Sequence, residues 1–349
     1  MRTAESHGRP RKAAEGRGRP WGVHDLGPFS AFYCLLLLSV ACPRAASASS
    51  ASIGTSGASF LDISQGSARA MALGHAYVGE AEGVDALTWN PAGIATASQN
   101  EIAYSYLGYV NGFSAPLYLA AVHPVGLTVW GANVGYLYDT SFDVRDVNGI
   151  PLTNYDPRVY DAFGTVSVAR AFDYEKLLTG ASLRVVHEDL GGYIQDNLVG
   201  DAGVEYKPRD WVSLGASMQN FGAPVSQVGN IGRVGAAFYP IEDMMFAVEA
   251  DKPEDDNWRV GLGAEFNVPE EYLQWAQLAF RVGYYSSDQY GQSFNSSLQT
   301  LHLDRTSGVS FGLGLFTSRA FGYGMSLDYA FVPFGAMGIV DQFTLKFKY

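Results

Sequence analysis

Apolar and polar side chains alternate strictly at the end of this chain. Over residues 341–349 every second position is apolar, and these positions hold Phe343, Leu345, Phe347 and Tyr349. Because successive side chains of a strand point to opposite faces, this segment would have one apolar and one polar face. A final amphipathic strand that ends in an aromatic residue is typical of bacterial outer-membrane barrels. We expect these four residues to face lipid and to belong to the signal that the barrel-assembly machinery reads.

The same alternation recurs along most of the chain after residue 98. Clear apolar rows, with their members two residues apart, run over positions 102–106, 212–218, 244–248, 258–266, 278–284, 309–315 and 323–331. Charged residues such as Arg259, Glu265, Arg281 and Asp328 fall on the opposite face. One face would meet lipid, and the other would line a wet or filled interior. A soluble β-protein is excluded, because its charged face would then have to form the outside of a very wide, unfilled barrel.

The alternating segments predict about fourteen strands. They lie near residues 99–107, 115–123, 126–141, 159–172, 178–190, 197–207, 211–220, 230–239, 244–252, 257–267, 275–286, 306–317, 321–331 and 339–349. Most have roughly the 9–11 residues that a tilted strand needs to cross a bilayer. An even count fits a closed antiparallel barrel with both termini in the periplasm.

The connections between these segments support the count. In outer-membrane barrels the periplasmic turns are short and the outer loops are long. Even-numbered strands end in tight connections, at 123–125, 207–210, 240–243 and 318–321, whereas long connections at 141–158 and 286–305 follow odd-numbered strands. A miscount by one strand would reverse this parity.

Residues 53–98 do not alternate. Residues 67–74 are rich in small side chains and predict a short helix, whereas 81–93 reads as a loop with a turn at Asn90-Pro91. Such a segment cannot face lipid, because its backbone polar groups would be left without hydrogen-bond partners. A barrel of about fourteen strands is also wide enough to need filling. We therefore expect the segment to plug the barrel.

The first 48 residues differ in kind from the rest. They contain seven of the 23 Lys and Arg residues and are followed by a strongly acidic body. An apolar centre at 35–38 and the sequence Ala46-Ser47-Ala48 predict a signal peptide with an extended basic n-region. Processing as a lipoprotein at Cys42 is an alternative. Because Cys34 and Cys42 both precede the predicted cleavage site, the mature chain would have neither a disulfide nor a thiolate metal site.

The overall composition agrees with a barrel and restricts the partners. Hydrophobic residues make up 47% of the chain and charged residues only 17%, yet no run of about 18 apolar residues follows the N-terminal segment. Residues 49–349 carry 16 basic and 32 acidic side chains, a net charge of −16 that argues against nucleic acid as a partner. Abundant Tyr and Phe, with Trp130, Trp211, Trp258 and Trp275, suit the aromatic belts of a membrane protein.

Two motifs near the N-terminus resemble a known family. They are the stretch Ala-Leu-Gly-His-Ala-Tyr-Val at 72–78 and the run Trp89, Asn90, Pro91, Ala92 and Gly93. Together they are similar to the start of the PorV/PorQ family, within the FadL-like outer-membrane proteins, and the resemblance continues through residues 327–334 to the last strand. It implies a fourteen-stranded all-β transmembrane barrel whose N-terminal hatch lies inside the lumen. The expected division is a signal peptide at 1–48, a hatch at 49–98 and a barrel at 99–349.

The resemblance implies two alternative functions. FadL-like members move hydrophobic small molecules across the outer membrane of diderm bacteria, and we take this as the leading hypothesis. PorV-like members instead serve type IX secretion and bind secreted cargo at the cell surface. The expected partners are outer-membrane lipids and the barrel-assembly machinery, with either a hydrophobic ligand or secretion-system proteins. The sequence does not indicate which residues would bind a ligand.

Catalytic chemistry finds little support in the sequence. The histidines are scattered without metal-ligand spacing, and residues 187–189 (His-Glu-Asp) are better explained as solvated groups at an outer strand end. The acidic run 254–256 reads as a solvated loop, and the Gly-x-Gly strings at 312–314 and 322–324 as lumen-facing glycines. We therefore expect no enzyme activity and no cofactor. Asn90-Pro91 has two interpretations, a turn that folds the hatch back or a movable plug contact.

Overall fold

The structure is a computed structural model. It describes residues 57–58, 60–63, 66–108, 117–139, 144–151, 159–224, 226–286, 308–320, 323–333 and 339–349. The predicted signal peptide, including Cys42, lies outside the described residues, and so do residues 49–56 of the expected hatch.

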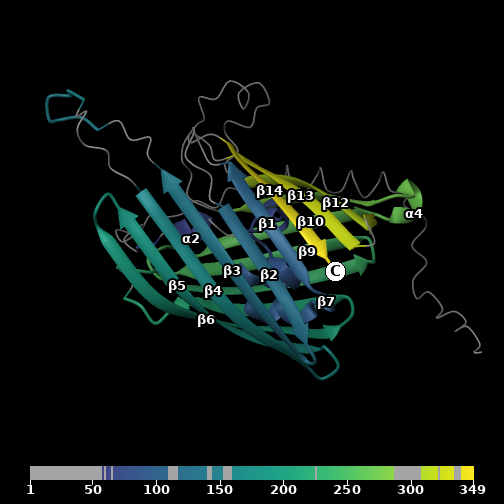
Figure 1. Cartoon of the computed structure of the whole chain (residues 1–349). Helices are drawn as coiled ribbons and strands as arrows, with labels where there is room; N and C mark the ends of the chain where they lie inside the picture. The colour runs from purple at the N-terminus through teal and green to yellow at the C-terminus, as the bar shows by residue number, and fades with distance from the viewer. Residues whose placement is uncertain are drawn as a thin grey trace, which may run out of the picture.

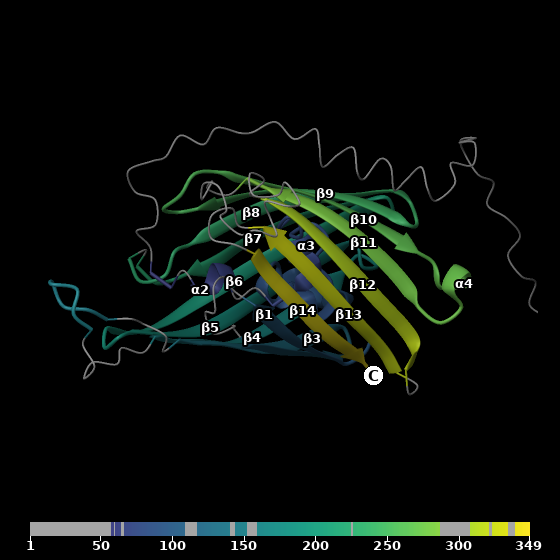
Figure 2. The ribbon, with the colours of Figure 1, turned by 90° about the horizontal axis from the view of Figure 1, so that it is seen from above.

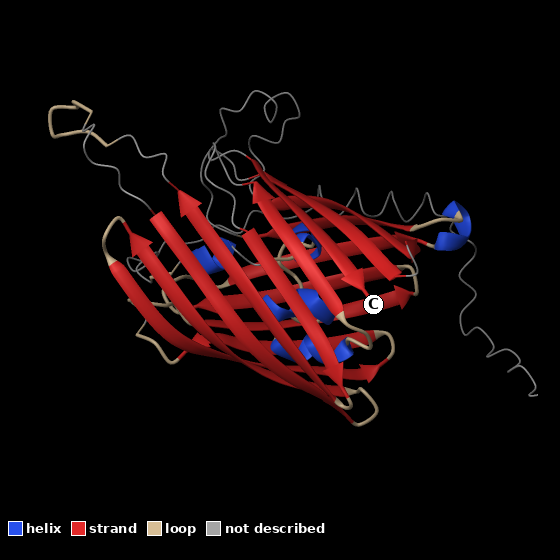
Figure 3. Ribbon diagram, viewed as in Figure 1, coloured by secondary structure: helices blue, strands red, loops and turns tan. Residues whose placement is uncertain are grey.

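The described residues form a closed antiparallel barrel of fourteen strands (Figures 1 and 3). The strands are β1 (Glu101–Gly108), β2 (Leu117–Val125), β3 (Thr128–Asp139), β4 (Val159–Phe172), β5 (Leu177–Leu190), β6 (Ile194–Arg209), β7 (Val212–Phe221), β8 (Ile231–Ile241), β9 (Met244–Pro253), β10 (Arg259–Val268), β11 (Gln277–Tyr285), β12 (Val309–Ala320), β13 (Tyr323–Pro333) and β14 (Ile339–Lys348). Each strand pairs with its neighbours in sequence, and β1 pairs with β14 to close the barrel. The predicted fold class and strand count are confirmed.

The two ends of the barrel differ. One end, called here the turn end, holds the start of β1, the end of β14 and the short connections that follow even-numbered strands. The opposite end is called the loop end. The predicted turns are shifted by a few residues: the expected turn at 123–125 lies within β2, which bends back at Gly126-Leu127 instead. One connection at the turn end is longer than the rest and carries the short helix α4 (Glu270–Leu273).

The apolar rows of the strands point outward, as expected. Ile102, Tyr104 and Tyr106 of β1 are each more than 40% exposed, while the residues between them are buried. Three of the predicted belt residues, Trp130, Trp211 and Trp275, are exposed close to the turn end, and Trp258 is exposed close to the loop end. This arrangement matches the two interfacial belts of a membrane barrel. Among the described residues, no helix combines the length and the hydropathy that a membrane span requires.

Residues 66–98, called here the interior segment, lie inside the barrel (Figures 2 and 3). The segment contains α3 (Ala68–Ala72), which contacts β11 to β14, and the 3₁₀ helices η1 (Gly83–Thr88) and η2 (Pro91–Thr96), which contact β1 to β6. A short helix α2 (Phe60–Ile63) precedes it near the loop end. The helix expected at 67–74 is present, and the Ser67 side chain caps it by accepting from Ala70 N. The expectation of a loop over 81–93 is wrong, because residues 83–88 and 91–93 are helical.

Candidate functional site

Asn90 joins the two 3₁₀ helices of the interior segment to the barrel wall. Its Oδ1 accepts from Ala92 N at 3.1 Å, which caps η2. Its Nδ2 donates to the carbonyl oxygen of Val78 at 2.9 Å and to that of Val204 on β6 at 3.2 Å. The fully buried amide therefore satisfies three backbone groups from three parts of the chain. Asn90 lies in the short connection between η1 and η2 and is the N-cap of η2. Its predicted role as the return turn of a hatch stays a prediction.

The neighbouring Trp89 is fully buried inside the barrel. The guanidinium of Arg233 lies 4.7 Å from its ring centroid, a cation–π contact. Its carbonyl oxygen accepts from Ser217 Oγ at 2.9 Å and from Gln219 Nε2 at 2.8 Å, both on β7. Pro91, Ala92 and Gly93 are also buried, so all five motif residues lie inside the barrel, and η2 packs against β3 to β6.

A chain of buried ion pairs and hydrogen bonds between charged or acidic side chains fixes the turn-end half of the interior segment. Arg69 of α3 contacts Glu265 of β10 at 2.8 Å and Glu80 of the interior segment at 2.8 Å. Glu265 also pairs with Arg281 at 2.6 Å, and Arg281 pairs with Asp328 at 2.6 Å. Guanidinium forks suit such linked carboxylates, because each presents several donors in a fixed plane. Glu265, Arg281 and Asp328 are among the charges that the alternation placed on the polar face, but no local pattern indicated their partners.

A second charged group holds the middle of the segment. Glu249 of β9 pairs with Arg233 at 3.1 Å through Oε1. Its Oε2 accepts from the backbone N–H groups of Tyr77 at 2.8 Å and Val78 at 2.7 Å. The carboxylate is buried and thus has both an ionic partner and backbone donors, as a buried charge requires.

Two titratable groups of the interior segment have strongly shifted pKa values. Burial raises the pKa of Glu80 to about 8, although the nearby Arg69 opposes the shift. Burial, together with the guanidinium groups of Arg233 and Arg259, lowers the pKa of His75 to about 3. His75 is therefore neutral near pH 7, and its ring stacks on Tyr285 with a centroid distance of 4.2 Å.

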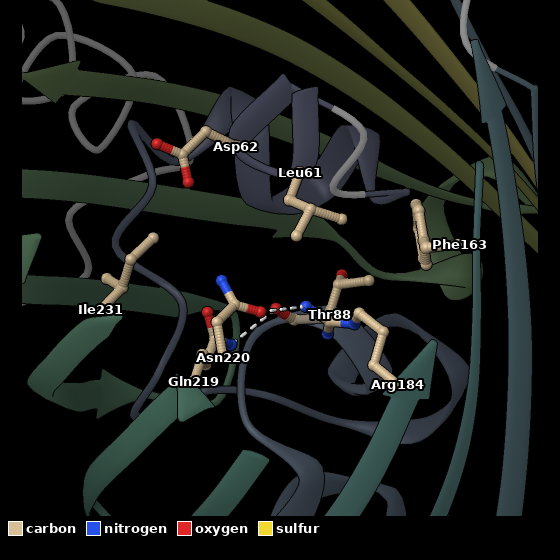
Figure 4. Close-up of a pocket in the computed structure, with 8 residues that line it drawn as sticks. All are labelled: Leu61, Asp62, Thr88, Phe163, Arg184, Gln219, Asn220 and Ile231. Carbon is tan, nitrogen blue, oxygen red and sulfur yellow. Dashed lines mark hydrogen bonds between the residues drawn. The ribbon is translucent and has the colours of Figure 1, made fainter. Parts of the chain in front are cut away.

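A small cavity lies between α2 and the segment, towards the loop end (Figure 4). Its volume is about 10 Å³, which is room for roughly one water molecule. Leu61 and Phe163 form its apolar side, whereas Arg184 and Asn220 form part of its polar side, joined by a hydrogen bond of 2.6 Å from Nη1 to Oδ1. Gln219 reaches the same cavity and donates to the Thr88 carbonyl oxygen at 2.7 Å.

A larger cavity of about 350 Å³ lies on the turn-end side of the segment. Its lining is mostly polar and includes Arg69, Glu82, Arg281, Lys346 and Lys348. The buried residues around Trp89 separate it from the cavity at the loop end. The interior segment therefore lies between two cavities that are lined largely by polar residues.

The other residues singled out in the sequence lie elsewhere. Phe343, Phe347 and Tyr349 are exposed on the outer face, and Leu345 is half-buried on that face. Their role in assembly stays a prediction. Glu188 is not solvated as expected: it is buried and accepts from Ala58 N at 3.2 Å.

Two further expectations about polar residues can be compared with the structure. Within the acidic run 254–256, Asp256 is buried and pairs with Arg259 at 2.6 Å, so it is not a solvated loop residue. Over the described ranges, no three His, Cys, Asp or Glu side chains are grouped in a way that could hold a metal ion.

Comparisons with known proteins support the fold. The search of family models gave no match, and neither did the search of curated sequences. Among solved structures, the toluene transporter TbuX of Ralstonia pickettii aligns with a TM-score of 0.55 at 13% identity, over 81% of this chain and 97% of that one. The chain therefore shares the fold of this barrel. The toluene transporter TodX of P. putida aligns with a TM-score of 0.50 at 14% identity, over 81% of this chain and 97% of that one. A Pseudomonas aeruginosa FadL homologue aligns with a TM-score of 0.50 at 11% identity, over 82% of this chain and 97% of that one.

Proposed function

We propose that the protein is an outer-membrane channel that passes hydrophobic small molecules, with the interior segment as its gate. The observation that carries this proposal is that part of the chain's own N-terminal region, residues 66–98, is buried inside the barrel, in a fold shared with two toluene transporters and a FadL homologue. An open porin would instead leave a water-filled channel.

The location follows from the outer surface of the barrel. Its exposed apolar rows suit hydrocarbon, and its aromatic residues at both ends suit the two interfaces. In this proposal the turn end faces the periplasm and the loop end faces the outside of a diderm bacterium. Export would depend on the signal peptide predicted at 1–48. The proposed activity is passage, not catalysis, and it needs no cofactor.

The PorV-like role in type IX secretion is the alternative, and it rests on the two N-terminal motifs. Those motifs lie inside the barrel: Tyr77 and Trp89 are fully buried, and Asn90 contacts the wall. A cargo protein at the cell surface would not reach them. The resemblance of the motifs to the PorV/PorQ family therefore supports a similar way of filling the lumen more than it supports a similar partner at the cell surface.

The direct test is entry of labelled toluene into proteoliposomes that contain the purified full-length protein. We expect faster entry than into protein-free vesicles of the same lipid, and no gain for a hydrophilic solute of similar size. A Phe163→Trp variant should slow entry, because the larger ring would occupy the loop-end cavity. The matched control is Phe311→Trp, whose side chain points outward from β12.

Equal toluene entry with and without the protein would overturn the transport proposal. The secretion alternative is tested separately by deleting the gene in the source bacterium and measuring proteins attached to the cell surface. Loss of those proteins with normal toluene uptake would replace transport by secretion.

A further inference from the structure

The seam between β1 and β14 is the one strand pair of the described barrel that no hairpin connects. Its partners come from opposite ends of the barrel sequence: the hydroxyl groups of Ser105 and Thr344 lie 3.0 Å apart although 239 positions separate them. The loss of chain entropy on forming a contact increases with the length of the loop that the contact closes. β1 is also short, with 8 residues. The seam is therefore the pair with the least local support.

The interior segment binds the β1 side of the seam through Glu101. This carboxylate is buried and lies opposite Lys348 in the register of β1 and β14. Its Oε1 contacts Lys348 Nζ at 2.9 Å across the seam, and its Oε2 accepts from Val84 N of η1 at 2.9 Å. One side chain thus connects β1, β14 and the interior segment.

The segment binds the β14 side as well. Thr344 Oγ1, which is fully buried, accepts from Ala68 N at the start of α3 at 2.9 Å. Lys346 of β14 forms an ion pair with Asp85 of η1. Thr344 and Lys346 also have partners in the barrel wall, Ser105 and Asp328 respectively. The segment adds further partners to these buried polar groups, which favours the closed seam because buried polar groups need hydrogen-bond or ionic partners.

Apolar packing covers the same seam. Met71 of α3 lies in one buried cluster with Leu107 of β1, Val340 of β14 and two residues of the neighbouring β13, Ala330 and Val332. Ala68 and Ala72 complete the α3 side of this cluster. Polar and apolar contacts therefore agree: the segment spans the junction of the first and last strands from inside.

We propose that the interior segment is an assembly clasp, which holds β1 against β14 and stabilises the final closure of the barrel. This role is independent of transport, because it concerns how the barrel closes and stays closed. It gives the N-terminal segment a function in folding that precedes any function as a gate.

The test compares two truncations inside the segment. Met71→Ala removes a buried side chain of the cluster that covers the seam, whereas Ile94→Ala removes one of similar size from η2, which contacts β3 to β6. Hydrogen exchange of the folded full-length variants in detergent would be measured at the amides of β1 and β14 and, for comparison, at those of β7 and β8. The seam ratio is the exchange rate at the amides of β1 and β14 divided by the rate at those of β7 and β8. We expect Met71→Ala to raise this ratio by about tenfold or more over the wild type, because removal of a large buried side chain destabilises its surroundings. Ile94→Ala should leave that ratio unchanged.

A seam ratio that is unchanged in Met71→Ala, or raised equally in both variants, would overturn the clasp. If the truncations do not fold, a milder pair replaces them. Asp85→Asn weakens the ion pair with the seam residue Lys346, and Ser310→Ala removes a hydrogen bond of 3.0 Å from β12 to the Ala72 carbonyl oxygen. The clasp predicts faster seam exchange in Asp85→Asn only, and equal ratios in this pair would contradict it.

Discussion

Asn90 lies directly against Gly203 of β6: a β-carbon at position 203 would be only 2.0 Å from Asn90 Oδ1. No real β-carbon contact is that short, so any other residue at 203 must push the asparagine away from the wall. The hydrogen bond from Asn90 Nδ2 to Val204 would be lost with that movement. The fit between the segment and the barrel thus depends on the absence of one methyl group.

Gly203→Ala should loosen the interior segment by about 1 to 3 kcal/mol, the usual cost of overpacking a closely packed interior. We expect larger ion conductance in planar bilayers and more leakage of a hydrophobic dye, if the segment is the gate. The matched control is Gly232→Ala on β8, where an added β-carbon meets no atom within 4 Å. Wild-type conductance and leakage in a folded Gly203→Ala barrel would contradict gating at this contact.

His75 should make the docking of the interior segment sensitive to acid. Its pKa is about 3 when docked and near 6.5 when solvated, so the undocked segment binds the proton more readily. This contribution to docking is complete above pH 6.5 and is lost as the pH falls towards 3, by roughly 2 to 3 kcal/mol at pH 4.5. His75→Asn suits the positive φ of this position and removes the titration.

The measurement for His75 is hydrogen exchange within residues 66–98 as a function of pH, corrected for intrinsic exchange. The wild type should lose protection between pH 6.5 and 4.5 more steeply than His75→Asn does. Parallel curves would show that His75 does not contribute to the acid sensitivity. Glu80 acts in the opposite direction, since its raised pKa of about 8 weakens docking as the pH rises.

Removal of residues 347–349 should sharply lower the amount of folded barrel in the membrane. Phe347 and Tyr349 are exposed on the lipid-facing side of β14, where assembly factors can contact them before closure. Folded protein is counted as the heat-modifiable band on gels. A suitable control is Phe311→Ser, which removes an exposed aromatic residue from β12. Unchanged levels after the deletion would mean that the terminal residues only fill the lipid-facing surface.

The full-length protein should fractionate with the outer membrane and resist carbonate extraction. The physical reason is the continuous outer surface of apolar side chains, which water would solvate poorly. Immunoblots of separated outer-membrane, inner-membrane and periplasmic fractions measure this directly. Recovery as a soluble periplasmic monomer would contradict the membrane location.

The alternation of side chains determined the barrel by itself. Period-two patterning states which face of each strand is apolar, and the outward rows at Ile102, Tyr104 and Tyr106 follow from it without knowledge of any partner. The short connections after even-numbered strands then indicated which end of each strand lies at which end of the barrel. The predicted strands match the structure within a few residues, although the turn at 123–125 was placed too early.

Only the tertiary structure decided how the interior is filled. The short 3₁₀ helices η1 and η2 have no periodic signal, since contacts with the wall stabilise them more than local preference does. Arg69 and Glu265 are 196 positions apart in sequence, and Glu101 reaches Val84 and Lys348 only because the barrel closes. The sequence shows that such charges face inward. Their pairing depends on the packing of the interior segment within the closed barrel, which no local pattern encodes.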